Sequence, residues 1–245
     1  MPGRTAFLEP PSFGIVFLAV PDQAVAEVAA KLAGLKPSRR LSFVHVSGAL
    51  GLGALEALRD HPIGSFHPLQ SFPAPRDPSA FRDITVAVDA SSPALMRRLR
   101  SLARAVGAQP RRVMDGDRAT YHAAAVFASN YVDVLLAEGI RLLQAAGWSE
   151  KEATAGLLAL TEGTLASVRR RGVVAGLTGP VRRGDVSTVE RHLAALSGPA
   201  ADLYRMLGVV ALEIAIEAGL EPAAAERMQR ALTGKTAATR RRRRA

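Results

Sequence analysis

One apolar run near the N-terminus limits what this 245-residue chain can fold into. Gly14–Val20 contains no polar side chain. A strand that is apolar on both faces is typical of a parallel sheet with helices packed on each side. Pro21 and Asp22 end the run, and a helical pattern then extends to about Leu32, with Asp22 as the expected N-cap. The first part of the chain is therefore expected to adopt an α/β fold.

Three further strands are predicted, and they alternate with helices. The strands cover Leu41–Val46, Ile63–His67 and Ile84–Val88. Ser92 and Pro93 are the residue types expected at the N-cap and at the first position of another helix. This alternation indicates βαβ units and hence a parallel sheet.

The strand patterns stop near Asp117, and helical periodicity follows. A long helix is predicted over residues 118–146, and Ser149 with Glu152 predicts a capping box for the next helix. Ser187 with Glu190 predicts a second box, and helices are expected over 187–196, 200–218 and 222–232. The expected fold class is thus α/β plus all-α. Its four parts are an irregular N-terminus (1–13), an incomplete parallel-sheet domain (14–110), a helical domain (111–233) and a disordered basic tail (234–245).

The tail dominates the net charge of +10, because Lys235 and Arg240–Arg244 carry six of these charges. A run of like charges is expected to be solvated and disordered. The alternative is a weak electrostatic contact with nucleic acid or acidic lipid, although the tail lacks the aromatic residues on which bases stack.

Several function classes are disfavoured by what the sequence lacks. The absence of cysteine excludes disulfides, thiolate zinc sites and cysteine nucleophiles. The spacing of His, Asp and Glu residues matches no metal site. Neither a membrane-spanning run nor a signal peptide is apparent, so a soluble cytoplasmic protein is expected.

Rare polar groups share one face of the predicted helix over 118–146. At about 100° per residue, His122, Ser129, Asn130 and Asp133 fall within an arc of about 100°. His122 is suited to proton transfer near neutral pH, and Asn130 with Ser129 could orient a substrate carbonyl or hydroxyl. The alternative is that this face only meets solvent or a neighbouring helix.

A second candidate lies in the loop Leu177–Asp185. Arg182 and Arg183 have the forked guanidinium that binds a carboxylate or phosphate, beside the backbone of Thr178 and Gly179. Asp185 either holds an arginine or caps the helix that follows.

A third candidate is the edge of the sheet where the strands end. Ser47–Gly53 follows the second strand, but its glycines are in the reverse order of a dinucleotide-binding turn. His67 and Gln70 follow the next strand at the same edge, where ligands bind in open α/β sheets. A histidine beside Pro68 is more often structural.

Five segments together, FLAVPD, HVSGA, FHPLQSF, YHAAAVFASN and LTGPVRRGD, resemble one bacterial family. It is the Rossmann-like family whose C-terminal part is called domain of unknown function 2520. The resemblance covers about Phe17 to Leu212. It implies a Rossmann domain that binds NADP or NAD, a helical domain that forms a homodimer, and kinship to pyrroline-carboxylate reductase, prephenate dehydrogenase and hydroxyacid dehydrogenases.

The chain departs from that family pattern at its N-terminus. Members begin with a strand, a GxGxxG turn, a helix and two further strands, whereas Met1–Phe13 contains none of these. The pyrophosphate of a dinucleotide needs such a turn at a helix N-terminus. We therefore expect an N-terminally truncated member that binds NAD(P)H weakly and exposes Gly14–Val20 as an edge prone to self-association.

The residues and the resemblance together predict an NAD(P)-dependent oxidoreductase that acts on a small anionic metabolite, with its site between the two domains. His122, Asn130 and Ser129 would be catalytic. Arg183, Thr178 and Gly179 would bind the substrate anion, and the cofactor side would be lined by Pro21, Ser47, Gly48 and His67. The alternative is a non-catalytic helical dimer or regulatory protein that has lost its cofactor site.

Overall fold

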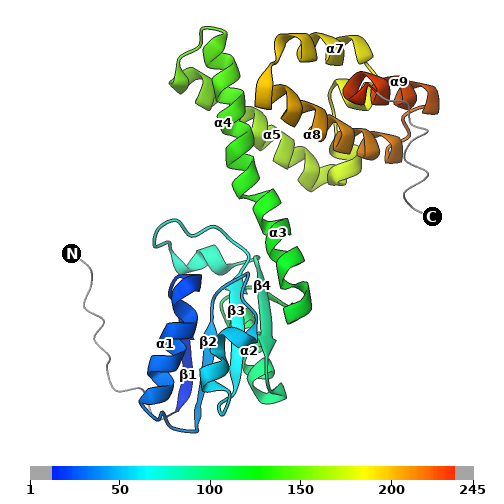
Figure 1. Ribbon diagram of the computed structural model, residues 1–245. Helices are drawn as coiled ribbons and strands as arrows, with labels where there is room; N and C mark the ends of the chain where they lie inside the picture. Colours follow the sequence, from blue (N-terminus) through cyan, green and yellow to red (C-terminus); the bar gives the residue numbers. More distant parts are fainter. Residues whose placement is uncertain (1–12, 235–245) are drawn as a thin grey trace. The chain divides into compact units, whose positions relative to one another are not determined.

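The computed structural model describes residues 13–234. The chain divides into two compact units, Met1–Asp133 and Val134–Ala245, which are described separately (Figure 1). The predictions made for the irregular N-terminus and for the basic tail lie outside the described residues.

The first unit contains a five-stranded sheet in the order β1-β2-β3-β4-β5. The strands are β1 (Gly14–Leu18), β2 (Leu41–His45), β3 (Ile63–Pro68), β4 (Thr85–Ala90) and β5 (Gln109–Arg112). Strands β1, β2 and β3 run parallel, as do β4 and β5. This mostly parallel sheet, followed by helices, confirms the expected fold class.

The sheet differs from the prediction in one pair, because β3 and β4 are antiparallel. A parallel pair needs a crossover, usually a helix of three turns or more. The connection here contains only the short 3₁₀ helix η2 (Pro78–Phe81), and β4 returns beside the strand that the chain has just left.

Helices cover both faces of this sheet. Helix α1 (Asp22–Gly34) and the 3₁₀ helix η1 (Leu52–Leu58) pack with Leu18, Leu41 and Phe43 on one face. Helix α2 (Pro93–Ala105) packs with Val44 and Phe66 on the other. Since neighbouring residues of a strand point to opposite faces, an all-apolar strand contributes side chains to the cores on both faces of the sheet.

Strand β1 is the edge of the sheet in the described part of the chain, where it pairs with β2. Its Phe17 ring packs edge-on against Phe66 at 5.8 Å. Self-association through this edge stays a prediction, and the part of it that concerns residues 1–12 lies outside the described residues.

The segment after β4 differs from the sequence prediction in two ways. Strand β5 was not expected, because the sequence of Gln109–Arg112 lacks an apolar pattern. The predicted helix over 118–146 is broken into α3 (Arg118–Ala128) and α4 (Asn130–Ala145) by Ser129, whose φ of −127° and ψ of −78° are not helical. Serine and asparagine favour such interruptions because their side chains compete for backbone hydrogen bonds.

The segment Asp115–Ala145 is long and apolar enough to cross a membrane by length and composition alone. The expectation that no run reaches that length is therefore wrong. Its most apolar window is not buried within the structure, which is also what a helix that packs against a second chain would show.

The second unit is helical. After α4 it contains α5 (Glu150–Gly176), α6 (Pro180–Arg183), α7 (Val186–Ala195), α8 (Gly198–Glu217) and α9 (Pro222–Thr233). Its core joins residues from α6 to α9, namely Val181, Val189, Leu212, Met228 and Leu232. Gly208 permits the close packing of α8 on α9, because a Cβ there would lie 2.5 Å from Leu232.

The N-caps predicted from the sequence can be compared with those in the structure. Ser92 caps α2, and Ser149 with Glu152 forms the predicted capping box of α5. The box expected from Ser187 and Glu190 is wrong, because Asp185 caps α7 by accepting a hydrogen bond from the Thr188 amide at 3.1 Å.

Candidate active site

A cavity of about 510 Å³ opens in the first unit where β3 ends beside α3. The polar residues that line it are His67, Gln70, Ser71, Tyr121, His122, Ser129 and Asn130. The structure thus brings together all three residues predicted to be catalytic and the histidine predicted for the cofactor side. The break in the helix at Ser129 does not disperse them.

Gly48 lies under the two histidines of this cavity. A Cβ on Gly48 would be 2.8 Å from Cε1 and Nε2 of His67 and 3.1 Å from Nδ1 of His122. Any side chain here would displace a ring. Three elements far apart in the sequence therefore converge at one point at the carboxyl edge of the sheet.

Ser47 has a structural role beside Gly48. Its hydroxyl donates to Asp22 Oδ2 at 2.8 Å and accepts from the amides of Ala49 and Leu50 at 3.1 and 3.0 Å. Asp22 is therefore not the N-cap that the sequence predicted. Pro21 occupies the cap position of α1 without a side-chain bond, and the Asp22 carboxylate fastens the start of α1 to the turn after β2.

Tyr121 and His67 form a pair that the sequence did not predict. The Tyr121 hydroxyl and His67 Nδ1 share a hydrogen bond of 2.8 Å, and the two rings meet edge-on with centroids 5.6 Å apart. Both side chains line the cavity. Because α3 supplies the tyrosine and β3 the histidine, the bond also ties the helix to the sheet.

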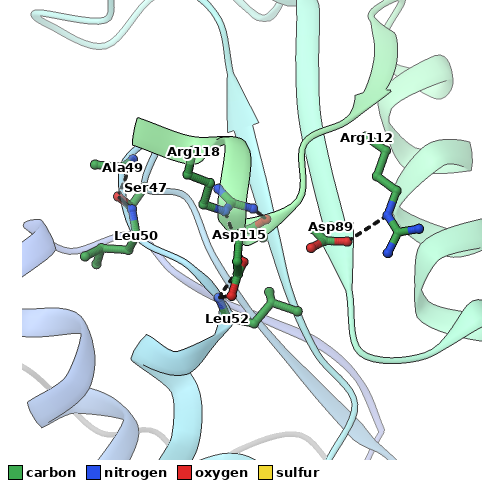
Figure 2. Close-up of polar contacts among 9 residues, drawn as sticks. Ser47, Ala49, Leu50, Leu52, Asp89, Arg112, Asp115 and Arg118 are labelled. Atoms are coloured by element: carbon green, nitrogen blue, oxygen red, sulfur yellow. Dashed lines mark hydrogen bonds and ion pairs between the residues drawn. The ribbon is translucent and has the colours of Figure 1, made fainter. Parts of the chain in front are cut away.

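A buried arginine lies at the start of α3 (Figure 2). Arg118 is 1% exposed and donates to Ser65 Oγ, while its Nε lies 3.4 Å from Asp115 Oδ1. The Asp115 carboxylate accepts from the amide of Leu52 at 3.1 and 3.0 Å. The loop before α3 is thus anchored to the loop after β2 by a carboxylate and a guanidinium.

Two buried groups of this cluster have unused hydrogen-bonding capacity. No hydrogen bond of normal geometry reaches either ring nitrogen of His45 or Nη1 of Arg118. A buried polar group that lacks a partner costs free energy, so such groups are common where a water or ligand binds or where electrostatics matter.

Burial and Arg118 shift the protonation of the residues around it. Burial first, and then the Arg118 charge, lower the pKa of His45 to about 4. Burial, followed by His122 and Arg118, lowers the pKa of His67. Burial raises the pKa of Tyr121, and Arg118 opposes that rise. At neutral pH this pattern favours neutral rings and a protonated phenol.

The three residues predicted to bind an anion lie in the second unit. Thr178, Gly179 and Arg183 line a separate cavity of about 710 Å³ together with Arg171, Arg182 and Glu221. Arg182 Nη2 donates to the carbonyl of Ala218 at 2.8 Å. The loop is more regular than expected, since Pro180–Arg183 forms the short helix α6 between Gly179 and Gly184, both with positive φ.

Sequence reasoning missed Tyr121, Arg118 and Asp115. Tyr121 stands next to His122 in the motif, and that adjacency was the available signal. Arg118 and Asp115 gave none, because a charged side chain before a helix is usually solvated. Only the tertiary contacts with Ser65 and Leu52 reveal their position.

Comparison with known proteins identifies the family. Residues 84–211 match the model of the family described as domain of unknown function 2520. The match covers more than half of the chain, so the protein belongs to this family, as the motifs predicted. No curated protein sequence matches it significantly.

Solved structures share the fold. Protein TM1727 from Thermotoga maritima has 24% identity and a TM-score of 0.72, over 86% of this chain and 81% of that one. BF3122 from Bacteroides fragilis, designated an NADP oxidoreductase, has 23% identity and a TM-score of 0.66, over 85% and 78%. A semialdehyde dehydrogenase NAD-binding protein from Cupriavidus necator, solved with calcium and NAD, has 16% identity and a TM-score of 0.52, over 78% and 77%. These likenesses establish a Rossmann-like fold.

Proposed function

We propose that this protein is a nicotinamide-dependent oxidoreductase for a small anionic metabolite, and that the cavity above Gly48 is its active site. The observation that carries the proposal is the convergence of His67, His122, Ser129 and Asn130 on that one cavity. The cavity lies at the carboxyl edge of a mostly parallel sheet, where α/β proteins bind their ligands. The names of two structural neighbours, which refer to NADP and NAD, support the same class.

Each residue has a role that its environment permits. His122 is exposed at the cavity, where it can exchange protons with a substrate and with water. Ser129 and Asn130 present a hydroxyl and an amide that can orient a carbonyl or imine. Pro21, Ser47, Gly48 and His67 form the side assigned to the cofactor.

The described residues fit part of a dinucleotide. Gly48 is buried against His67 and His122, so the flat nicotinamide ring that supplies hydride in such enzymes would lie on the cavity side of these two rings. The described strand-to-helix turns do not suit a pyrophosphate, because α1 begins with Pro21 and Asp22 instead of glycine amides, and a carboxylate there repels an anion. We therefore assign proton chemistry alone to the residues of this chain and expect weak binding of the free dinucleotide.

The cavity of the second unit is suited to an anion. Arg171 and Arg183 supply positive charge, and Thr178 and Gly179 supply a hydroxyl and a backbone amide. Glu221 lines the same cavity, and its negative charge disfavours ligands that carry several negative charges. We assign to this cavity the binding of a carboxylate.

The alternative function is a non-catalytic helical dimer, and a specific feature favours the dimer itself. Long apolar side chains are widely exposed on α4, α5 and α8, including Leu142, Leu160, Leu165, Met206 and Val210. Exposed apolar surface of this extent is typical of a protein interface. We propose a homodimer through these helices, which is compatible with either function.

Oxidation of NADPH by the purified full chain separates the two functions. The assay follows the loss of NADPH absorbance with a panel of 2-oxo acids and cyclic imino acids. An oxidoreductase oxidises NADPH with at least one panel member, and His122→Ala lowers kcat by ~10²-fold or more without unfolding the protein. Absence of turnover across the panel, with no saturable NADPH binding, would favour the non-catalytic dimer.

Arg183→Ala tests the anion-binding assignment. This exposed side chain has no core to disrupt, so the melting temperature should be unchanged while the affinity of the second unit's cavity for a small carboxylate falls. Arg191→Ala on α7 is a matched surface control that lies outside the cavity. Unchanged carboxylate affinity in Arg183→Ala, measured by calorimetric titration, would remove the second cavity from the proposal.

A further inference from the structure

Tyr121 has no task in the roles assigned so far, and neither has its hydrogen bond to His67. Both side chains line the cavity, and their 2.8 Å hydrogen bond allows a proton to pass directly between the phenol and the imidazole. The tyrosine is half-buried, so its hydroxyl can face a ligand from a partly dry position. A phenol in such a place can donate a proton to an oxygen or nitrogen.

The second nitrogen of His67 continues the path toward solvent. Nε2 of His67 and Nδ1 of His122 lie beside Gly48. They are 2.8 and 3.1 Å from the position that a Cβ on Gly48 would occupy. His122 is exposed, whereas Tyr121 is not. A half-buried phenol, a half-buried imidazole and an exposed imidazole therefore lie in sequence along the cavity wall.

The charge of Arg118 suits the pair to proton transfer. A buried guanidinium disfavours an imidazolium ring beside it and favours a phenolate, and it acts on both His67 and Tyr121. Arg118 itself is held by Ser65 and Asp115, so its position is fixed by the sheet and not by a ligand. A neutral His67 can pass a proton by exchanging tautomers without ever becoming charged.

We propose that Tyr121 is the residue that gives the proton to the substrate, and that His67 and His122 restore it. The Tyr121 O–H bond breaks as its proton moves to the substrate oxygen or nitrogen. The phenolate then takes the Nδ1 proton of His67, while His67 Nε2 takes a proton from His122 or from water. No electrons change hands in these steps, and the hydride comes from the reduced nicotinamide. This inference rests on the proposed function.

In this scheme Tyr121 is catalytic and His67 is a positioning residue that also relays the proton. A purely structural role for the bond is the competing explanation. The chain contains a natural control, since His192 Nδ1 and Tyr204 share a bond of the same 2.8 Å with rings at the same 90°. That pair lies in the second unit, and neither residue lines the cavity.

The test compares Tyr121→Phe with Tyr204→Phe in the full chain, using NADPH and the panel members that wild-type protein reduces. We expect Tyr121→Phe to lower kcat by ~10²-fold or more, with KM and melting temperature nearly unchanged. Tyr204→Phe should keep wild-type kcat. His67→Gln should move the limb of the pH–rate profile that reports the relay, which a merely structural bond would not do.

The outcomes separate this inference from the function on which it rests. If wild-type protein turns over and Tyr121→Phe matches it, the inference is overturned and the oxidoreductase proposal stands. If Tyr121→Phe loses kcat only in proportion to a fall in melting temperature, the bond is structural and the inference is again overturned. If wild-type protein reduces no panel member, the proposed function fails, and the inference fails with it.

Discussion

At the scale of single residues, His45 makes the fold sensitive to acid. Its folded pKa of about 4 lies below the usual 6.5, because of burial and then of Arg118. Between these two values the unfolded chain binds a proton that the folded protein does not. The free energy of unfolding should therefore have its full value above pH 6.5. It should decrease by up to ~3 kcal/mol as the pH falls to about 4.

Chemical denaturation at pH 7 and at pH 4.5 measures this effect. His45→Gln should reduce the difference in unfolding free energy between the two pH values. His192→Gln, at an exposed histidine, should leave that difference as it is in the wild type. Equal acid sensitivity in all three proteins would show that His45 is not the responsible group.

Gly48 makes a second residue-scale prediction. Gly48→Ala should displace the His67 ring, because its Cβ would lie 2.8 Å from that ring. The ring is the far end of a side chain that can move, so the stability should change by about 1 kcal/mol at most, while kcat falls by about 10²-fold. Gly53→Ala, where a Cβ meets no atom within 4 Å, is the control. Wild-type activity in Gly48→Ala would show that the geometry above Gly48 is not needed.

Residues of the candidate site were predictable to different degrees. His67 and Gly48 could be found because His67 lies at the end of β3 and Gly48 follows β2, and both strands end at one edge of the sheet. Tyr121 could not be assigned, because tyrosine in an apolar helix is usually a packing residue. Asp22 was assigned to a cap by its residue type, whereas the structure uses it to hold Ser47 from a position 25 residues away.

At the scale of elements, the capping box of α5 gives a direct test. Ser149 accepts a hydrogen bond from the Glu152 amide, and the Glu152 carboxylate accepts one from the Ser149 amide at 3.0 Å. Ser149→Ala should lower the unfolding free energy of the protein by ~1 kcal/mol. Ser197→Ala, at an N-cap of α8 without a side-chain bond, should cost less. Equal losses would mean that the box does not stabilise α5.

Elements that form because of their own residue pattern could be predicted from the sequence. Elements that form because of contacts with distant parts of the chain could not. Residue pattern alone placed the buried strands and most helices of the second unit. Strand β5 forms because Gln109–Arg112 pairs with β4, although its own residues do not favour a strand. The antiparallel direction of β4 beside β3 is a tertiary feature for which the residue pattern gives no signal.

At the scale of the whole molecule, exposed apolar helices predict a dimer. Leu160 and Met206 are 67% and 69% exposed on α5 and α8. The double variant Leu160→Glu/Met206→Glu should shift a dimer to monomer, because charges are costly in a buried interface. Sedimentation velocity measures the shift. Leu35→Glu, at a 52% exposed leucine in the first unit, should remain dimeric.

A wild-type protein that sediments as a monomer would contradict the dimer. A dimer that survives the double substitution would place its interface elsewhere, and the edge strand β1 would then be the next candidate.

If the cavity above Gly48 holds the nicotinamide ring of the cofactor, protein NMR should detect it there. The five histidines of the chain give few imidazole resonances. On titration with NADPH, the resonances of His67 and His122 should shift together and saturate, even if binding is weak, while the exposed His192 should not respond. Unchanged His67 and His122 signals at high NADPH concentration, or a response confined to His192, would contradict this account.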